Sequence, residues 1–99
     1  MNGNNGERNK DDRKNEAELV EMGKFYFVNM KYDHAITEFN RALELNRENP
    51  EIYYNLGLAY EGKSDRDSAR EMYEKALVIN PEYAIAREHL DRILGISTK

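Results

Sequence analysis

The stretch YYNLGLAY at residues 53–60 decides the fold of this chain, because a related stretch, LVEMGKFY, lies 34 residues earlier at 19–26. The overlay needs no gap and continues beyond these stretches, so that Gly23 falls on Gly57 and Phe39 falls on Tyr73. Further coinciding pairs are Leu19 and Tyr53, Met22 and Leu56, Tyr26 and Tyr60, Ala35 and Ala69, Ala42 and Ala76, and Leu43 and Leu77. Self-similarity at one fixed period is the signature of repeat architecture. The sequence therefore predicts two copies of one structural unit.

Apolar residues recur at spacings of three and four, which is the period of one face of an α-helix. The first series is Leu19, Met22, Tyr26 and Met30, and no segment reads as a strand. The chain is therefore predicted to be all-α. Five helices are expected, and they begin near Asn15, Asp33, Asn49, Asp65 and Glu82, with the second reaching Leu45 and the last reaching Leu94.

Capping residues mark several of these helix ends. Asn15 followed by Glu18 is the pattern of a capping box, in which each side chain accepts a backbone N–H of the other residue. Asn49 can cap the third helix, and Pro50 suits its first position, where the missing N–H is not needed. Gly95 is expected to end the last helix.

Gly23 and Gly57 need a physical reason, since glycine in a helix interior costs about 1 kcal/mol relative to alanine. The expected reason is the close approach of the neighbouring helix, which presents small residues in return. The large residues Tyr26, Phe39, Tyr60 and Tyr73 would fill the space between the close points.

These positions carry a family resemblance. The second copy resembles the tetratricopeptide repeat (TPR) pattern through Tyr53-x-x-Leu56-Gly57-x-x-Tyr60, Ala69-x-x-x-Tyr73-x-x-Ala76 and Pro81. The first copy has the matching Leu19-x-x-Met22-Gly23-x-x-Tyr26 and Ala35-x-x-x-Phe39-x-x-Ala42. The resemblance implies an α-solenoid of antiparallel helix-turn-helix units. The predicted organisation is a disordered polar arm (1–15), a TPR domain (16–95) made of two repeats (16–49 and 50–83) and a capping helix (84–95), and a tail (96–99).

Two departures from the family pattern stand out. Arg47 stands where the family often has proline, and Pro50 follows three residues later. Asp91 stands where the last helix would need a small residue, so that helix is expected to be a cap rather than the start of a third repeat.

Composition excludes several classes of function. The chain has 99 residues, 39% hydrophobic and 34% charged, with a net charge of −4 and no cysteine. Basic residues are interspersed with acidic ones, which argues against a nucleic-acid binder. No apolar run approaches the roughly 20 residues of a membrane span, and the N-terminal residues lack the apolar core of a signal peptide. A cytoplasmic protein is expected.

No catalytic or metal-binding pattern is found, so the sequence predicts neither an enzyme nor a cofactor. The two histidines, His34 and His89, are 55 residues apart, and a surface role is expected for His34. Acidic pairs such as Glu16 and Glu18 begin helices, where negative charge offsets the helix dipole.

A protein-binding role is what the TPR resemblance implies, with the first helix of each repeat lining a concave groove. The residues expected to be exposed in this groove, and to bind a peptide or helix of a partner protein, are Val20, Glu21, Lys24, Phe27, Tyr54, Asn55, Leu58 and Glu61. Val28 belongs to the same exposed set in the first copy, and Ile85, His89 and Arg92 continue it on the cap. The apolar members of the set suggest a partner site rimmed by charge.

The clamp with which some family members hold a C-terminal carboxylate is not predicted here. That clamp needs Lys and Asn in the first copy, where Val20 and Lys24 stand. Asn55 matches in the second copy, but Ile85 and His89 replace the required Lys and Arg on the cap.

The alternative function is self-assembly. Repeat arrays usually need about three units, and this chain has two and a cap. Residues 25–28, Phe-Tyr-Phe-Val, are consecutive apolar neighbours that cannot all face one helix, and Phe25 stands where the second copy has the much smaller Ala59. The open end or groove of the first repeat is therefore expected to be covered by a partner or by a second copy, and dependence on protein concentration separates the two.

Overall fold

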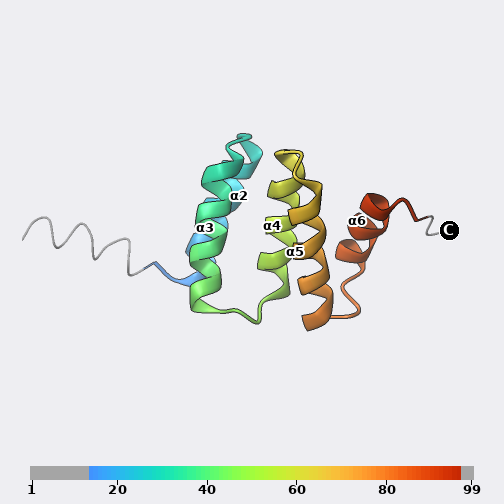
Figure 1. Ribbon diagram of the computed structural model, residues 1–99. Helices are drawn as coiled ribbons and strands as arrows, with labels where there is room; N and C mark the ends of the chain where they lie inside the picture. Colours follow the sequence, from blue (N-terminus) through green and yellow to red (C-terminus); the bar gives the residue numbers. More distant parts are fainter. Residues whose placement is uncertain (1–13, 97–99) are drawn as a thin grey trace, which may run out of the picture.

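The computed structural model describes residues 14–96, and all of its regular structure is helical, as predicted. The five helices are α2 (Glu16–Val28), α3 (Tyr32–Leu45), α4 (Pro50–Gly62), α5 (Arg66–Ile79) and α6 (Ala84–Leu94). They form two antiparallel pairs, α2 with α3 and α4 with α5, stacked side by side with α6 at the far end (Figure 1). The fold is thus an all-α solenoid of two antiparallel helix pairs and a C-terminal helix. The predicted disordered arm (1–15) lies outside the described residues except for its last two positions, as does most of the predicted tail.

Polar side chains cap α2, α4 and α5 where the sequence predicted. The Glu18 N–H donates to Asn15 Oδ1 at 2.8 Å, and the Asn15 N–H donates to Glu18 Oε1 at 3.1 Å, which completes the capping box. Asn49 caps α4 with Pro50 at its first position, and Gly95 ends α6 in the left-handed conformation. The last helix begins at Ala84, the first residue of the predicted capping helix, rather than near Glu82, because the Tyr83 N–H donates to the Asn80 carbonyl in a turn.

The end of α2 differs from the prediction. Met30 was expected on the apolar face of the first helix, but α2 ends at Val28, and Met30 is exposed with a φ of 62°. Ser64, 34 residues later, has a φ of 66°. In both turns the following N–H, that of Lys31 or Asp65, bonds back into the helix at 2.9 Å. The two repeats therefore share one left-handed turn, built in both cases without glycine.

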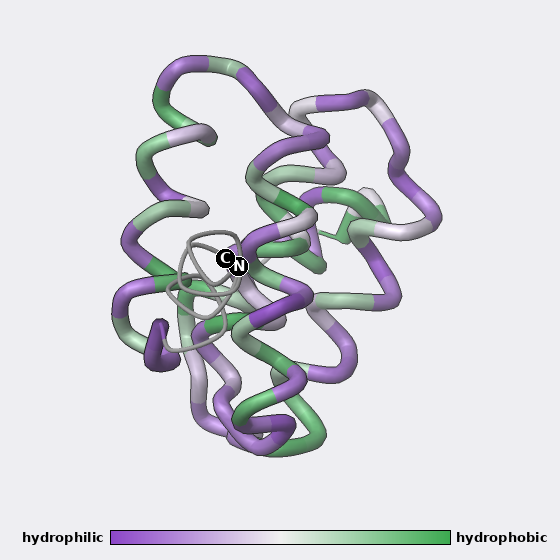
Figure 2. Tube along the Cα trace, turned by 90° about the vertical axis from the view of Figure 1, so that its left-hand side faces the viewer, coloured by the Kyte–Doolittle hydropathy of each residue, from purple (hydrophilic) through white to green (hydrophobic). Residues whose placement is uncertain are grey.

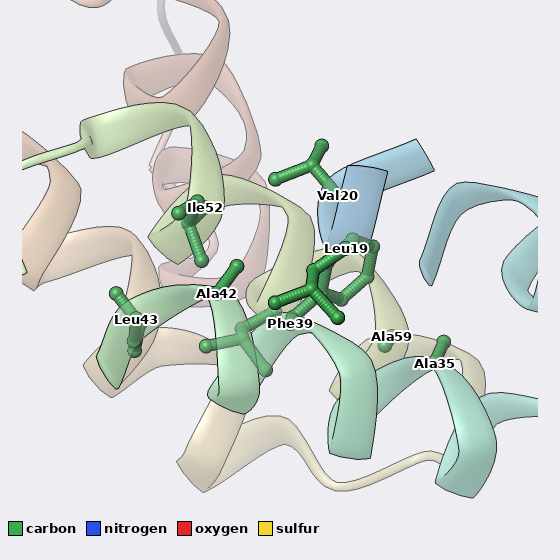
Figure 3. Close-up of a cluster of buried hydrophobic side chains, with 9 residues drawn as sticks. Leu19, Val20, Ala35, Phe39, Ala42, Leu43, Ile52 and Ala59 are labelled. Atoms are coloured by element: carbon green, nitrogen blue, oxygen red, sulfur yellow. The ribbon is translucent and has the colours of Figure 1, made fainter. Parts of the chain in front are cut away.

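The core fills the space between neighbouring helices. Figure 3 shows Leu19, Phe39 and Ile52, from α2, α3 and α4, pointing into one cluster of buried side chains. A second cluster lies between α5 and α6 and includes Tyr73 and Leu90. Along the helices, hydrophilic and hydrophobic segments alternate, as Figure 2 shows, which is expected when one face of each helix is buried.

The two repeated glycines have the role predicted for them, with an aromatic ring as the close neighbour. A Cβ atom on Gly23 would overlap the ring of Phe39, and one on Gly57 would overlap the ring of Tyr73. Phe39 and Tyr73 are both almost fully buried. Each glycine therefore makes room for the largest fully buried side chain of its own repeat.

Within residues 14–96, no helix is both long and apolar enough to cross a membrane.

Candidate partner-binding groove

A hollow of about 350 Å³ lies between α2 and the start of α4. Its lining residues are Glu16, Ala17, Val20, Glu21 and Lys24 from α2, with Asn49 and Glu51 from the start of α4. The hollow therefore lies between the first helices of the two repeats. We call it the α2/α4 groove. Of the eight predicted binding residues, it brings together Val20, Glu21 and Lys24.

The polar rim of the groove is predominantly acidic. Lys24 Nζ lies 3.0 Å from Glu51 Oε2 and 3.8 Å from Glu21 Oε2, so one ammonium bridges the two helices. The hydrogen bond to Glu51 raises the pKa of Lys24 above its ordinary value. Glu16 accepts hydrogen bonds from the side-chain amides of Asn46, at 3.1 Å, and Asn49. Three carboxylates therefore face one ammonium, and the groove has negative charge to offer a ligand.

Val20 was predicted to be exposed, and this was wrong: it is 6% exposed. Stacking of the second repeat onto the first makes it part of the cluster that contains Leu19 and Ile52 (Figure 3). The remaining edge of Val20 still lines the groove. It therefore gives the groove an apolar floor between charged walls.

Asn55 was also predicted to be exposed and is instead buried, at 6%. It lies one turn beyond Glu51 on the same side of α4. Among the described residues, no acceptor bonds to its buried Nδ2 atom. An unpaired buried amide costs about 1–3 kcal/mol. Asn55 therefore places an unused hydrogen-bond donor beneath the face on which the groove lies.

Tyr54 is half-buried among other rings rather than free in the groove. Its ring centroid lies 5.9 Å from that of Tyr73, 5.7 Å from Tyr83 and 5.5 Å from His89. Its hydroxyl lies 3.4 Å from His89 Nε2, and burial raises its pKa. Tyr54 thus packs α4 against α6.

Glu61 belongs to the same contact. The Tyr73 hydroxyl donates to Glu61 Oε1 at 2.6 Å, and His89 Nδ1 lies 3.4 Å from the same oxygen. Burial, followed by this hydrogen bond, raises the pKa of Tyr73 far above the ordinary tyrosine range. We call Tyr54, Glu61, Tyr73 and His89 the α6 anchor. This cluster was not predicted from the sequence. The repeat period contained a signal for it, because His89 lies 34 residues after Asn55, the neighbour of Tyr54, and so occupies the equivalent position on the next first helix.

The two other predicted residues, Phe27 and Leu58, are half-buried and do not line the groove. The ring of Phe27 lies 5.6 Å from that of Tyr32, at the turn between α2 and α3. On the cap, Ile85 and Arg92 are exposed while His89 is tied into the α6 anchor. The predicted surface is thus divided into a groove over α2 and α4 and a packed contact between α4 and α6.

The described residues contain no group of three His, Cys, Asp or Glu side chains able to hold a metal ion. His34 is exposed, as predicted, with its ring 5.1 Å from that of Tyr26.

Comparisons with known proteins agree with this architecture. A TPR repeat family model matches residues 23–64, and a tetratricopeptide repeat family model matches residues 50–83. The mitochondrial import receptor subunit TOM70 of Saccharomyces cerevisiae is 42% identical over 66 residues, which is 67% of this chain and 10% of that protein. Mouse tetratricopeptide repeat protein 14 is 33% identical over 75 residues, which is 76% of this chain and 10% of that protein.

Among solved structures, the crystal structure of MamA superposes with a TM-score of 0.79 at 28% identity. The match covers 82% of this chain and 47% of MamA. The chain therefore spans about a tenth of the curated relatives and about half of this structure. Together, the repeat register, the glycine–aromatic pairs and the two family matches show that the chain belongs to the tetratricopeptide repeat family.

Proposed function

We propose that this chain is a scaffold module that binds a short segment of a partner protein in the α2/α4 groove. The family supports a role in protein–protein interaction in general. The observation that carries the more specific proposal is the hollow itself, because it spans the first helices of both repeats and has charged walls over the apolar edge of Val20. Pockets that recognise ligands commonly combine an apolar surface with a few polar groups that fix orientation.

The chemistry of the groove selects the kind of segment. Glu16, Glu21 and Glu51 outnumber Lys24, so a segment with Lys or Arg side chains gains from electrostatic complementarity. The apolar edge of Val20, which lines the groove, offers contact to one apolar side chain of the segment. A basic peptide with one small apolar anchor fits both features.

Filling the groove tests the proposal without disturbing the core. Ala17 lines the hollow and is exposed, so Ala17→Trp occupies it from the surface. Val78 on α5 is 81% exposed and is not among the groove residues, so Val78→Trp is a control that introduces the same side chain elsewhere. Peptides selected from a random displayed library on the unmodified protein would be labelled and titrated by fluorescence anisotropy.

The expected result is a loss of affinity of at least about tenfold in Ala17→Trp, with Val78→Trp unchanged. Glu21→Lys should weaken binding of the same peptides. Rising salt should weaken their binding to the unmodified protein, since the interaction between exposed charges is screened over a Debye length of about 8–10 Å near physiological salt. Equal binding to the Ala17→Trp and unmodified proteins would show that the selected peptides bind elsewhere. Tyr54→Ala is a poor probe, because it would also loosen α6.

A further inference from the structure

The outer side of α2 carries exposed apolar residues at the N-terminal end of the array. Phe25 is 64% exposed and Val28 is 73% exposed, and the two lie three positions apart on one side of the helix. Figure 2 is viewed from this end of the stack. We call the Phe25 and Val28 side of α2 the end face.

The internal repeat shows what such a face does. One period later, Phe25 corresponds to Ala59 and Glu18 corresponds to Ile52, both of which are fully buried. Ala59 and Ile52 belong to the cluster that joins α4 to the preceding repeat, together with Ala42 of α3. The end face of α2 is therefore the counterpart of a stacking interface that is already formed once within the chain.

The end face is not shaped for another copy of α3, however. The stacked position is filled by alanine in α4, and a side chain as large as phenylalanine would not fit there. The far end of the array also lacks a matching surface. On α6, Arg87 and Asp91 take the positions of Leu19 and Gly23, and their side chains lie 4.0 Å apart as an ion pair. Head-to-tail stacking would bury this pair, which is costly.

The two terminal segments of the sequence offer few apolar side chains to such a face. Residues 1–13 contain one apolar residue, Met1, and residues 97–99 contain none. A second copy of this chain is a better match, because its own α2 presents the same apolar end face. Two like patches are self-complementary when a two-fold axis relates them.

We propose that two copies of this chain dimerise through their α2 end faces, with the two helices antiparallel about a two-fold axis near Phe25. The antiparallel direction places the acidic first turn of one α2, with Glu18, opposite the exposed Lys31 that follows the other. A parallel pair would instead set Glu18 against its own copy. An apolar patch of this limited size is expected to give a weak dimer, as small transient interfaces do.

Sedimentation velocity at concentrations from about 1 to 200 μM tests the assembly. The expected mass rises from that of one 11.6 kDa chain to that of two and stops there. Phe25→Glu and, independently, Val28→Glu should each keep the protein monomeric across this range, whereas Val78→Glu on α5 should leave the dimer unchanged. Circular dichroism of each variant confirms that the helices are retained.

The absence of cysteine permits a clean test of direction. Positions 21 and 29 lie four residues on either side of Phe25, so an antiparallel pair brings position 21 of one copy near position 29 of the other. An oxidised mixture of Glu21→Cys and Asn29→Cys should give mainly the mixed disulfide. A preference for like pairs would overturn the antiparallel arrangement.

A monomer at all concentrations would overturn the proposal, and so would a mass that grows past two chains or a dimer that survives Phe25→Glu. Ala17→Trp should leave the dimer intact, which keeps this result separate from that of peptide binding.

Discussion

Replacing Gly57 by alanine should destabilise the protein, although the same change stabilises most helices. Alanine gains about 1 kcal/mol over glycine from helix propensity. Its Cβ, however, would overlap the ring of Tyr73, which is fully buried and whose hydroxyl is fixed 2.6 Å from Glu61. Overpacking costs about 1–3 kcal/mol, and a ring displaced from a charged acceptor loses roughly another 1.5–3 kcal/mol. Set against the helix-propensity gain, these costs leave a net loss of about 3 kcal/mol.

The matched change in the first repeat separates the two contributions. Gly23→Ala would overlap Phe39 in the same way, but Phe39 has no hydroxyl to hold it. We therefore expect Gly23→Ala to cost about 2 kcal/mol less than Gly57→Ala. Urea unfolding followed by circular dichroism measures both, and Gly57→Ala should also lower the melting temperature by about 15 °C. A Gly57→Ala protein as stable as the parent would refute the packing role of this glycine.

Two other predictions concern the turns and the α6 anchor. Met30→Gly and Ser64→Gly should each stabilise the protein by about 1 kcal/mol in urea titrations, because both positions are left-handed and strained for a side chain; a loss of stability would contradict this. The pKa of Tyr73 is raised in the folded state. The stability that its neutral hydroxyl contributes is therefore fully present below about pH 10, the pKa of free tyrosine, and is lost as pH rises further. Above pH 10 the unfolding free energy should fall by about 1.4 kcal/mol per pH unit from this group, and Tyr73→Phe should remove that slope; equal slopes would exclude Tyr73 as the source.

The repeat register carried most of the fold prediction. A 34-residue period placed both helix pairs, and the cost of glycine in a helix indicated a close contact at Gly23 and Gly57. Met30 was misplaced because apolar periodicity does not reveal a left-handed turn that lacks glycine. Comparison with the polar Ser64, one period later, held the missing information, since a core position is seldom shared by methionine and serine.

The groove was harder to predict because exposure depends on how the repeats stack. Val20 and Asn55 both lie on first helices, but neither helix face reveals by itself how much of it the neighbouring repeat covers. On α4, the side chains of Tyr54 and Glu61 would be exposed without α6, which covers them through contacts with His89. These contacts join residues about one repeat period apart in the sequence. Glu21 and Lys24 line the groove because they lie on an edge of α2 that the second repeat leaves at least partly open.

The capping helix α6 is held differently from the rest of the array. Repeats in a solenoid are stabilised by their nearest neighbours, and α6 has a neighbour on one side only. Much of that contact is the α6 anchor, in which polar groups bond to one another. Water can compete for these hydrogen bonds, whereas the cluster around Phe39 consists of apolar side chains. Stability against local opening should therefore differ along the chain. The amide hydrogens of α6 should exchange through local opening well before those of α3 and α4.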